Sequence, residues 1–278
     1  MTRRVPGAVW HVGVLVLLAV VLYPVAWVVA STFKPSAAVL GDLRLLPDPA
    51  TTANYERVFD GVVGIEVGVF FLNSAVLAVL SVVGTVASSA PAAYAFARLR
   101  FRGRTTLFAV MIATLLLPVH VLVIPQYVVF RRLGLVDTYV PLLAGKFLAT
   151  EAFFVFLIVQ FIRTLPPELD ESAKIDGAGQ WSVFRHVVLP LCRPALITTA
   201  IFTFIWSWND FFGPLIYLSS PDKYPLPLAL QLFIDETTGS DFGALMAMSV
   251  LALVPVVLFF LFFQRFLVEG VSTTGIKG

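Results

Sequence analysis

The sequence predicts an all-α integral membrane protein with six transmembrane helices. Of its 278 residues, 59% are hydrophobic and only 13% are charged, whereas a soluble domain carries about 25% charged residues. The apolar residues are gathered into runs of helix length, and not into the alternating segments of roughly ten residues that build a membrane β-barrel. We therefore expect residues 1–278 to form a single transmembrane domain.

Six apolar runs are long enough to cross a bilayer core of about 30 Å, because a helix rises about 1.5 Å per residue. The first run follows Arg3 and Arg4 and is longer than the roughly 7–15 residues of a signal-peptide core, so we expect it to be retained. Pro118 and Pro125 predict kinks in the third run. The predicted spans are 9–30, 70–97, 107–130, 138–162, 194–218 and 242–266.

The polar segment 163–194, between the fourth and fifth spans, predicts two short helices joined by a hinge. Pro166 or Pro167 can open the first helix, and the acids of its first turn suit the helix dipole. Gly177 and Gly179 predict the break, as glycine does at a helix C-terminus. The acids are Glu168, Asp170 and Glu171.

The second helix of this segment is predicted from apolar residues at helical spacing, with prolines to end it. An exposed pair of helices held between two spans is typical of an element that docks a partner protein. The apolar residues are Trp181, Phe184, Val187 and Val188, and the prolines are Pro190 and Pro194.

The distribution of positive charge predicts the orientation. With six spans, both termini and segment 163–194 lie on one side of the membrane, and loops 31–69 and 219–241 lie on the other. Lysine and arginine are more numerous on the side of the termini, although Arg131 and Arg132 run against the trend. By the positive-inside rule, the termini and segment 163–194 are cytoplasmic, and the loops 31–69 and 219–241 are extracytoplasmic.

The composition gives no sign of catalytic or metal chemistry. The chain has one cysteine, Cys192, and its three histidines, His11, His120 and His186, show no metal-ligand spacing. A phosphate-binding loop of the form GxxxxGK[ST] is absent. We expect no catalytic residue, no metal and no cofactor on this chain, and we expect Cys192 to serve packing.

Residues 171–178, with the sequence Glu-Ser-Ala-Lys-Ile-Asp-Gly-Ala, together with Phe184, Leu189-Pro190 and Pro194, resemble the EAAxxDGA…F…LP…P loop of ABC importer permeases. In that family the loop is the coupling helix, which sits in a cleft of the cytoplasmic ATPase. Ser172 stands where the family usually has alanine, and serine is small enough to keep the packing close.

The resemblance implies which residues of this loop dock the ATPase. Glu171 and Asp176 would pair with basic groups in the cleft, and Ala173 would allow close backbone approach. Gly177 would form the chain reversal, where a side chain would meet the steric cost of positive φ. The implied docking residues are Glu171, Ser172, Ala173, Asp176, Gly177, Ala178, Phe184 and Pro190.

Further stretches resemble the carbohydrate-importer branch of the family, in particular the six-span second permease that is similar to the maltose-importer subunit. They are Ser31-Thr-Phe-Lys-Pro35 with Asn54-Tyr55, Asn73-Ser74, Ala92 to Arg98 with Phe101 to Arg104, Trp208 to Phe211 with Pro214-Leu215, and the ending Gln264-Arg265-Phe266 through Gly275 to Gly278. In that family the C-terminal tail can reach between the ATPase subunits, which implies contacts by Lys277 and Gly278. The alternative is a frayed terminus.

The outer half of the fifth span carries the candidates for the substrate pathway. Aromatic faces can stack on a sugar ring, and an amide or a carboxylate can bond its hydroxyls. The alternatives are an interfacial aromatic belt and hydrogen bonds to a neighbouring helix. The candidates are Trp206, Trp208, Asn209 and Asp210.

Polar groups also lie within or beside the third and fourth spans. Because burying a charge in a bilayer is costly, Lys146 and Glu151 are candidates for a water-lined path, or they could snorkel or pair with a partner subunit. His120 and Gln126 are the other members of this group.

We therefore expect a permease subunit of an ATP-driven importer in the cell membrane, which takes up a mono- or oligosaccharide by alternating access. Its expected partners are a second permease, two ATPase subunits and an extracytoplasmic substrate-binding protein, with no nucleic acid. A polyol or glycerol phosphate is the alternative cargo. A secondary transporter, which would need no ATPase and would use intramembrane ions, is the alternative mechanism.

Overall fold

The structure is a computed structural model that describes residues 7–234 and 241–272, and these residues are mainly helical. The longer helices are α1 (Gly7–Ser31), α2 (Ala53–Phe59), α3 (Val67–Arg98), α4 (Arg104–Thr114), α5 (Val119–Arg132), α6 (Val140–Phe147), α7 (Ala152–Thr164), α8 (Glu168–Ile175), α11 (Arg193–Trp208) and α14 (Phe242–Ser272). The shorter ones are α9 (Gln180–Val183), a π-helical segment (Phe184–Val188), α10 (Leu189–Leu191), α12 (Phe212–Tyr217), α13 (Leu226–Ala229) and three 3₁₀ turns (Ser36–Ala38, Pro221–Lys223 and Leu230–Phe233). Within the described ranges, the one β-bridge joins Val62 and Ile65.

Four helical stretches are long and apolar enough to cross a membrane by themselves. They are Trp10–Ser31, Val67–Arg98, Val140–Thr164 and Phe242–Gln264, and the bent pair Gln180–Leu191 and Arg193–Trp208 makes a fifth if it is counted as one span. The first, second and sixth predicted spans therefore match single helices in the structure. The all-α membrane fold is confirmed, while helix length alone does not fix the count at six.

The third predicted span, 107–130, is not one helix but two. Helix α4 ends at Thr114, and α5 begins at Val119 after Pro118 in an extended conformation. The reason is Pro118, which lacks an N–H and disfavours the α region for the residue before it. Pro125 lies inside α5 without ending it. A kink was predicted at Pro118, and the structure shows a complete break of the helix there.

The fourth predicted span, 138–162, is also interrupted. Helix α6 ends at Phe147, α7 begins at Ala152, and Ala149 between them adopts a left-handed φ of 56°. The fifth span breaks at Asn209–Phe211, between α11 and α12. Both breaks bring polar side chains to the middle of apolar segments.

The chain divides into two compact units. The first contains the chain up to Gly68 together with Ala229–Pro255, and the second contains Val69–Leu228 and the chain from Val256 on. In the first unit, Asn54 donates to the carbonyls of Thr32 and Lys34 at 2.7 Å each. The fully buried Lys34 in turn donates to the carbonyls of Asp42 and Arg44. The Lys-Pro and Asn-Tyr motifs of the sequence thus fold the loop that follows α1.

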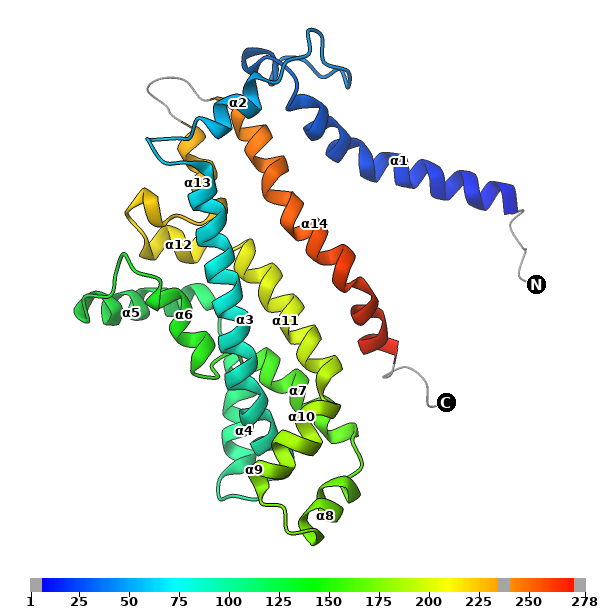
Figure 1. Ribbon diagram of the computed structural model, residues 1–278, viewed down its shortest axis with the longest axis vertical. Helices are drawn as coiled ribbons and strands as arrows, with labels where there is room; N and C mark the ends of the chain where they lie inside the picture. The colour runs from blue at the N-terminus through cyan, green and yellow to red at the C-terminus, as the bar shows by residue number, and fades with distance from the viewer. Residues whose placement is uncertain (1–6, 235–240, 273–278) are drawn as a thin grey trace. The chain divides into compact units, whose positions relative to one another are not determined.

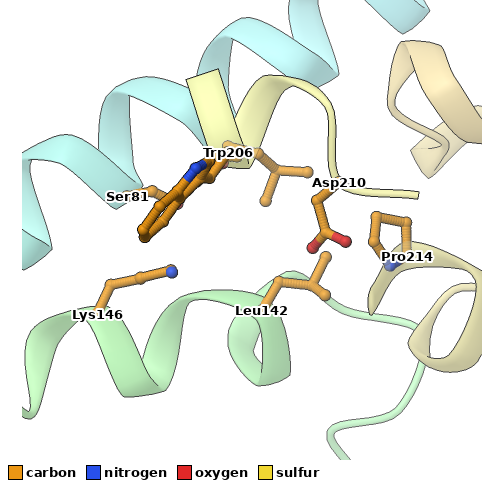
Figure 2. A pocket seen from close by; sticks show the side chains of 8 residues that line it. Ser81, Leu142, Lys146, Trp206, Asp210 and Pro214 are labelled. Carbon is orange, nitrogen blue, oxygen red and sulfur yellow. The ribbon is translucent and has the colours of Figure 1, made fainter. Parts of the chain in front are cut away.

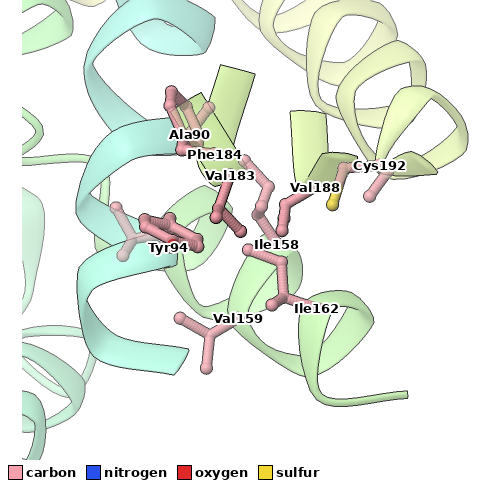
Figure 3. Packing of buried hydrophobic residues seen from close by; sticks show 12 residues of the cluster. Ala90, Tyr94, Ile158, Val159, Ile162, Val183, Phe184, Val188 and Cys192 are labelled. Atoms are coloured by element: carbon pink, nitrogen blue, oxygen red, sulfur yellow. The ribbon is translucent and has the colours of Figure 1, made fainter. Parts of the chain in front are cut away.

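The second unit has a hydrophobic core shared by α3, α7 and the segment that follows α8. Figure 3 shows the side chains from α3 turned toward those from α7 and from the π-helical segment. The core residues are Ala90, Ala93, Tyr94, Val155, Ile158, Val159, Ile162, Val183, Phe184, Val188, Cys192 and Ala195. Cys192 is buried, as expected for a packing residue.

One side of helix α3 is buried, and many of the residues along it are small. Close approach of helix backbones inside a membrane favours such residues. The buried small residues of α3 are Ser74, Ala78, Ser81, Thr85, Ser89, Ala90 and Ala93. Gly84 adds to them, because a Cβ on this glycine would lie 2.7 Å from Cδ2 of Phe147 in α6.

The segment between α12 and α13 is held in place by side chains of two other elements. Asn73 of α3 donates to the carbonyls of Asp222 and Tyr224. The carboxylate of Asp137, before α6, accepts bonds from the backbone N–H groups of Ser219 and Ser220, the Ser220 hydroxyl and the Lys223 ammonium. This segment belongs to the loop that the sequence predicts to be extracytoplasmic.

Candidate functional site

The predicted docking element consists of α8, a turn and α9, followed by the π-helical segment and α10. Pro167 precedes α8, and the acidic first turn lies where the helix dipole favours it. In Figure 1 the elements α8, α9 and α10 gather at the end of the second unit where α3 ends. The helices and the break between them therefore agree with the prediction.

The turn after α8 depends on Gly177. Its φ is +86°, and its N–H donates to the carbonyl of Lys174, while the N–H of Ala178 donates to the carbonyl of Ala173. Such bonds satisfy the carbonyls that a helix leaves unpaired at its C-terminus. Gly179, in contrast, has a φ of −70° and forms the N-cap of α9.

The outer face of the docking element is exposed and contains two large apolar side chains. Ile175 is 86% exposed and Trp181 is 65% exposed. Around them lie the exposed residues Glu171, Ser172, Lys174 and Asp176. These two side chains are the largest apolar groups that the docking element exposes to a partner.

The inner face of the docking element packs on the chain's own core. Ala173 and Ala178 are half-buried against the core, and Phe184 is 5% exposed, with its ring 5.2 Å from that of Tyr94. Three of the residues that the resemblance assigns to ATPase docking thus pack against the chain's own core, Phe184 fully and the two alanines in part. Pro190 is exposed within α10.

The helical segment that begins at Gln180 does not stop at Pro190. It runs to Leu191 and then bends by 74° at Cys192 into α11. Pro190 and Pro194 flank this bend, so the second helix ends between the two prolines that were predicted to stop it.

Arg98, the last residue of α3, binds the docking element from behind. Its Nε lies 3.2 Å from Oδ2 of Asp170 in α8, with both side chains largely buried. Its guanidinium also donates to the carbonyls of Ile162 and Leu165 at the end of α7, at 3.1 and 2.7 Å. Sequence reasoning missed this role of Arg98 and read Asp170 only as a first-turn acid.

A cavity of about 250 Å³ lies in the second unit, beside the break between α11 and α12. Figure 2 shows Lys146 and Leu142 of α6 on one side of the cavity, with Ser81, Trp206 and Asp210 facing them. The lining residues are Leu77, Ser81, Leu142, Lys146, Trp206, Ser207, Asp210 and Pro214. The cavity is close to the lower end of the range of about 300–1,000 Å³ that is usual for small-molecule sites.

Two of the four predicted substrate-pathway residues line this cavity. Trp206 packs against Phe154 at 5.2 Å and Phe153 at 5.6 Å. Asp210 accepts a hydrogen bond from the N–H of Gly213 at 3.1 Å and so helps to begin α12. The carboxylate therefore has a structural role as well as a position at the cavity.

The other two predicted residues do not line the cavity. Trp208 is 5% exposed and packs against Phe204. Asn209 is exposed, and its amide donates to the carbonyl of Ile205 at 2.7 Å, which caps α11.

Lys146 and Glu151 pair with each other at 2.6 Å across the break between α6 and α7. Lys146 also lines the cavity, while Glu151 does not. The sequence singled out both residues because a charge within an apolar segment is costly, but it did not reveal that they pair with each other. Sequence reasoning gave no signal for Ser81 and Ser207, whose hydroxyls lie 3.1 Å apart.

Lys277 and Gly278, the predicted ATPase-contacting tail, lie outside the described residues. His120 packs edge-on against Phe212, with the ring centroids 4.8 Å apart. Among the described residues, no group of three or more His, Cys, Asp or Glu side chains is placed to hold a metal.

Comparison with known proteins places the chain among membrane transport proteins. Residues 84–273 match the family model described as "Binding-protein-dependent transport system inner membrane component". The matched range contains the docking element and most residues that line the cavity.

Several curated relatives are similar over nearly their whole length. The diacetylchitobiose uptake system permease protein NgcG of Streptomyces coelicolor is 32% identical over 96% of this chain and 87% of that protein. The arabinooligosaccharides transport system permease protein AraQ of Halalkalibacterium halodurans is 31% identical, over 96% and 95%. The trehalose transport system permease protein SugB of Mycobacterium tuberculosis is 31% identical, over 97% of each.

A solved structure has the same fold. It is a chain from the crystal structure of a bacterial ABC transporter involved in the import of the acidic polysaccharide alginate, with a TM-score of 0.79 and 25% identity over 93% of this chain and 95% of that one. The resemblance to ABC importer permeases is thereby confirmed, and the chain belongs to the family of binding-protein-dependent transport system inner membrane components.

Proposed function

We propose that this chain is the permease subunit of an ATP-driven importer that takes up an oligosaccharide by alternating access. The chain is a non-catalytic subunit, because in this family the ATPase is a separate chain. We propose a carbohydrate as the cargo because the chain is similar to permeases of diacetylchitobiose, arabinooligosaccharide and trehalose uptake. A second permease, two ATPase subunits and an extracytoplasmic binding protein complete the proposed transporter.

The exposed face of α8 and α9 is the proposed ATPase-docking surface. Ile175 and Trp181 supply apolar anchors, and Glu171 and Asp176 supply charge around them. Large apolar anchors with a polar rim are the usual anatomy of a protein interface. Ala173, Ala178 and Phe184 fix this face from behind, so that a movement of the ATPase displaces the membrane helices and not only the loop.

The docking proposal requires α8 and both termini to face the cytoplasm. The excess of lysine and arginine on this side supports that orientation. The loop pinned by Asp137, which contains Lys223 and Tyr224, then faces outward, where a binding protein delivers its cargo.

The cavity beside Asp210 is the proposed part of the sugar pathway on this chain. The indole of Trp206 is 47% exposed and provides a flat apolar surface. The carboxylate of Asp210, the ammonium of Lys146 and the hydroxyls of Ser81 and Ser207 provide hydrogen-bonding groups for sugar hydroxyls. We assign substrate contact to Trp206 and Asp210, and not to the buried Trp208 or to Asn209.

An uptake assay in a strain that lacks this chain tests the proposed function. Labelled diacetylchitobiose, an arabinooligosaccharide, trehalose and glycerol phosphate would be supplied in turn, with and without the chain restored. We expect chain-dependent uptake of one oligosaccharide, blocked by vanadate, which inhibits the ATPase. Uptake that is insensitive to vanadate would instead support a secondary transporter, and uptake of glycerol phosphate alone would replace the proposed cargo.

The docking surface is tested by the variant Ile175→Asp. A carboxylate in the apolar centre of an interface is desolvated without a partner, so we expect the ATPase to be lost when the complex is purified from membranes. Val63→Asp is the matched control, because Val63 is 68% exposed in loop 31–69 on the opposite predicted side. Retention of the ATPase by Ile175→Asp would contradict the docking proposal.

A further inference from the structure

Helix α3 is attached to the docking element although the chain does not connect them directly. The docking element is covalently continuous with α7 before it and with α11 after it. Only side-chain contacts hold α3 to it. The polar contacts come from two residues four apart, Tyr94 and Arg98, which share a face of the helix. Ala90 and Ala93 of the same helix add apolar packing in the core that Val183, Phe184 and Val188 also join.

Arg98 makes the first set of contacts. Its ion pair with Asp170 reaches the first turn of α8, and its two bonds to Ile162 and Leu165 satisfy carbonyls at the C-terminus of α7. A guanidinium can do this because its planar fork holds several donors in fixed directions. One side chain thus ties the ends of α3 and α7 to the docking helix.

Tyr94 makes the second set. Its hydroxyl donates to Oε1 of Gln180, the first residue of α9, at 3.0 Å. Its ring lies 5.2 Å from the ring of Phe184 in the π-helical segment. The docking element is therefore held on α3 at both of its helices.

The middle of α3 forms part of the cavity wall. Leu77 and Ser81 line the cavity, and α3 remains helical from there through Pro91 to Arg98. Arg98 lies 17 positions beyond Ser81, which corresponds to about 26 Å of helix. The path from the docking element to the cavity through α11 is less direct, because it passes the π-helical segment and the 74° bend at Cys192.

We propose that Arg98 and Tyr94 are positioning residues that make α3 move as one body with the docking element. This inference rests on the proposed docking of an ATPase. Displacement of α8 then shifts the Leu77–Ser81 wall of the cavity directly, and the alternation of access depends on the Arg98–Asp170 pair.

A distance measurement between spin labels tests the inference. The labels would be placed at Glu168→Cys in α8 and Val83→Cys in α3, both exposed, in a Cys192→Ser background. The assembled transporter in lipid nanodiscs would be measured without nucleotide and after trapping with ATP and vanadate. We expect the same distance in both states when Arg98 and Tyr94 are present.

Variants of Arg98 and Tyr94 test whether these residues attach α3 to the docking element, separately from whether the protein folds. In Arg98→Ala combined with Tyr94→Phe, we expect the resting distance to be retained and the trapped distance to shift by about 2 Å or more, the scale of helix shifts between packed states. Arg98→Lys, which keeps the charge but not the fork of donors, should restore the fixed distance only in part. Arg100→Ala, at an exposed arginine of the following turn, is the matched control. If Arg98→Ala fails to assemble, Tyr94→Phe alone should show the shift in smaller measure.

Two results would overturn the inference. One is a distance that changes between the two states in the unaltered protein, and the other is a distance that stays fixed in the double variant. Failure of the proposed function gives a different result, because the ATPase would then be missing from the purified complex before any distance is measured.

Discussion

The ring of Phe147 in α6 lies directly against Gly84 in α3, where a Cβ would come within 2.7 Å of Cδ2 and 2.8 Å of Cε2. One turn further along α3, the Ser88 hydroxyl donates to the carbonyl of Lys146 at 2.7 Å. The close approach at Gly84 therefore sets where α6 places the Lys146 side chain at the cavity.

We expect Gly84→Ala to destabilise the protein by about 1–3 kcal/mol, the usual cost of overpacking a core. The measurement is the midpoint of thermal unfolding in detergent, together with uptake. Gly68→Ala in the same helix is the matched control, since nothing lies within 4 Å of its added Cβ. Gly84→Ala combined with Phe147→Leu should recover part of the loss, and equal midpoints for the Gly84 and Gly68 variants would contradict the steric reading.

Gly177→Pro should leave the protein in the membrane and abolish uptake. Proline fixes φ near −65°, whereas Gly177 has a φ of +86° and uses its N–H in the turn. Gly177→Ala should be milder, because a left-handed residue other than glycine costs about 1–2 kcal/mol. Membrane content by immunoblot and uptake are the readouts.

Gly179→Ala is the control for that experiment, because its φ is −70° and no atom lies within 4 Å of an added Cβ. Normal transport by Gly177→Pro would show that the reversal after α8 is dispensable.

Asp137 should hold the segment 219–224 in place at neutral and mildly acidic pH. The Lys223 ammonium, the Ser220 hydroxyl and the backbone N–H of Ser219 hold the pKa of the Asp137 carboxyl well below its ordinary value of 3.8. A carboxyl group whose pKa is lowered by folding stabilises the folded state at every pH above its ordinary pKa. This stabilisation is lost only as the pH falls through the lowered pKa. Protection of this segment from proteolysis should therefore be constant from pH 8 to pH 5.

Asp137→Asn should abolish that protection throughout the same range, since the amide cannot pair with the Lys223 ammonium. Asp222→Asn changes an exposed carboxylate in the same segment and is expected to behave as the unaltered protein. A wild-type segment that becomes sensitive to protease already at pH 5 would show that the Asp137 contacts do not anchor it.

Trp206→Ala should raise the sugar concentration needed for half-maximal uptake, with the amount of protein in the membrane unchanged. Loss of an aromatic contact of about 0.5–1.5 kcal/mol corresponds to roughly a 2- to 13-fold change. Trp206→Phe keeps an aromatic face and should lie close to the unaltered protein. An identical effect of the two substitutions would remove Trp206 from the proposed sugar pathway.

The sequence predicted those features that depend on local composition. Hydropathy located α1, α3 and α14 within a few residues, because a bilayer-spanning helix must be apolar along its whole length. Glycine and acidic residues located α8 and the turn at Gly177, because these features follow from backbone sterics and from the helix dipole.

Features that depend on tertiary contacts were not predictable. No glycine or proline marks the break after Phe147, where Ala149 is left-handed and the Lys146–Glu151 pair bridges the gap. Likewise, the Arg98–Asp170 pair joins residues that are far apart in the chain, so neither residue carries a local signal. Phe184 was assigned to ATPase docking from its position in the motif, which does not tell which face of the helix it occupies, and the structure buries its side chain.

The small residues along the buried side of α3 have a mechanical consequence. Serine, threonine and alanine have few rotamers to exchange, so a helix lined by Ser74, Ala78, Ser81, Thr85, Ser89 and Ala93 can slide past its neighbours without first unlocking interdigitated side chains. Sliding of packed helices is one of the two common modes of domain closure. Large aliphatic residues at the same positions would interdigitate with the neighbouring helices and would have to change rotamer before those helices could slide.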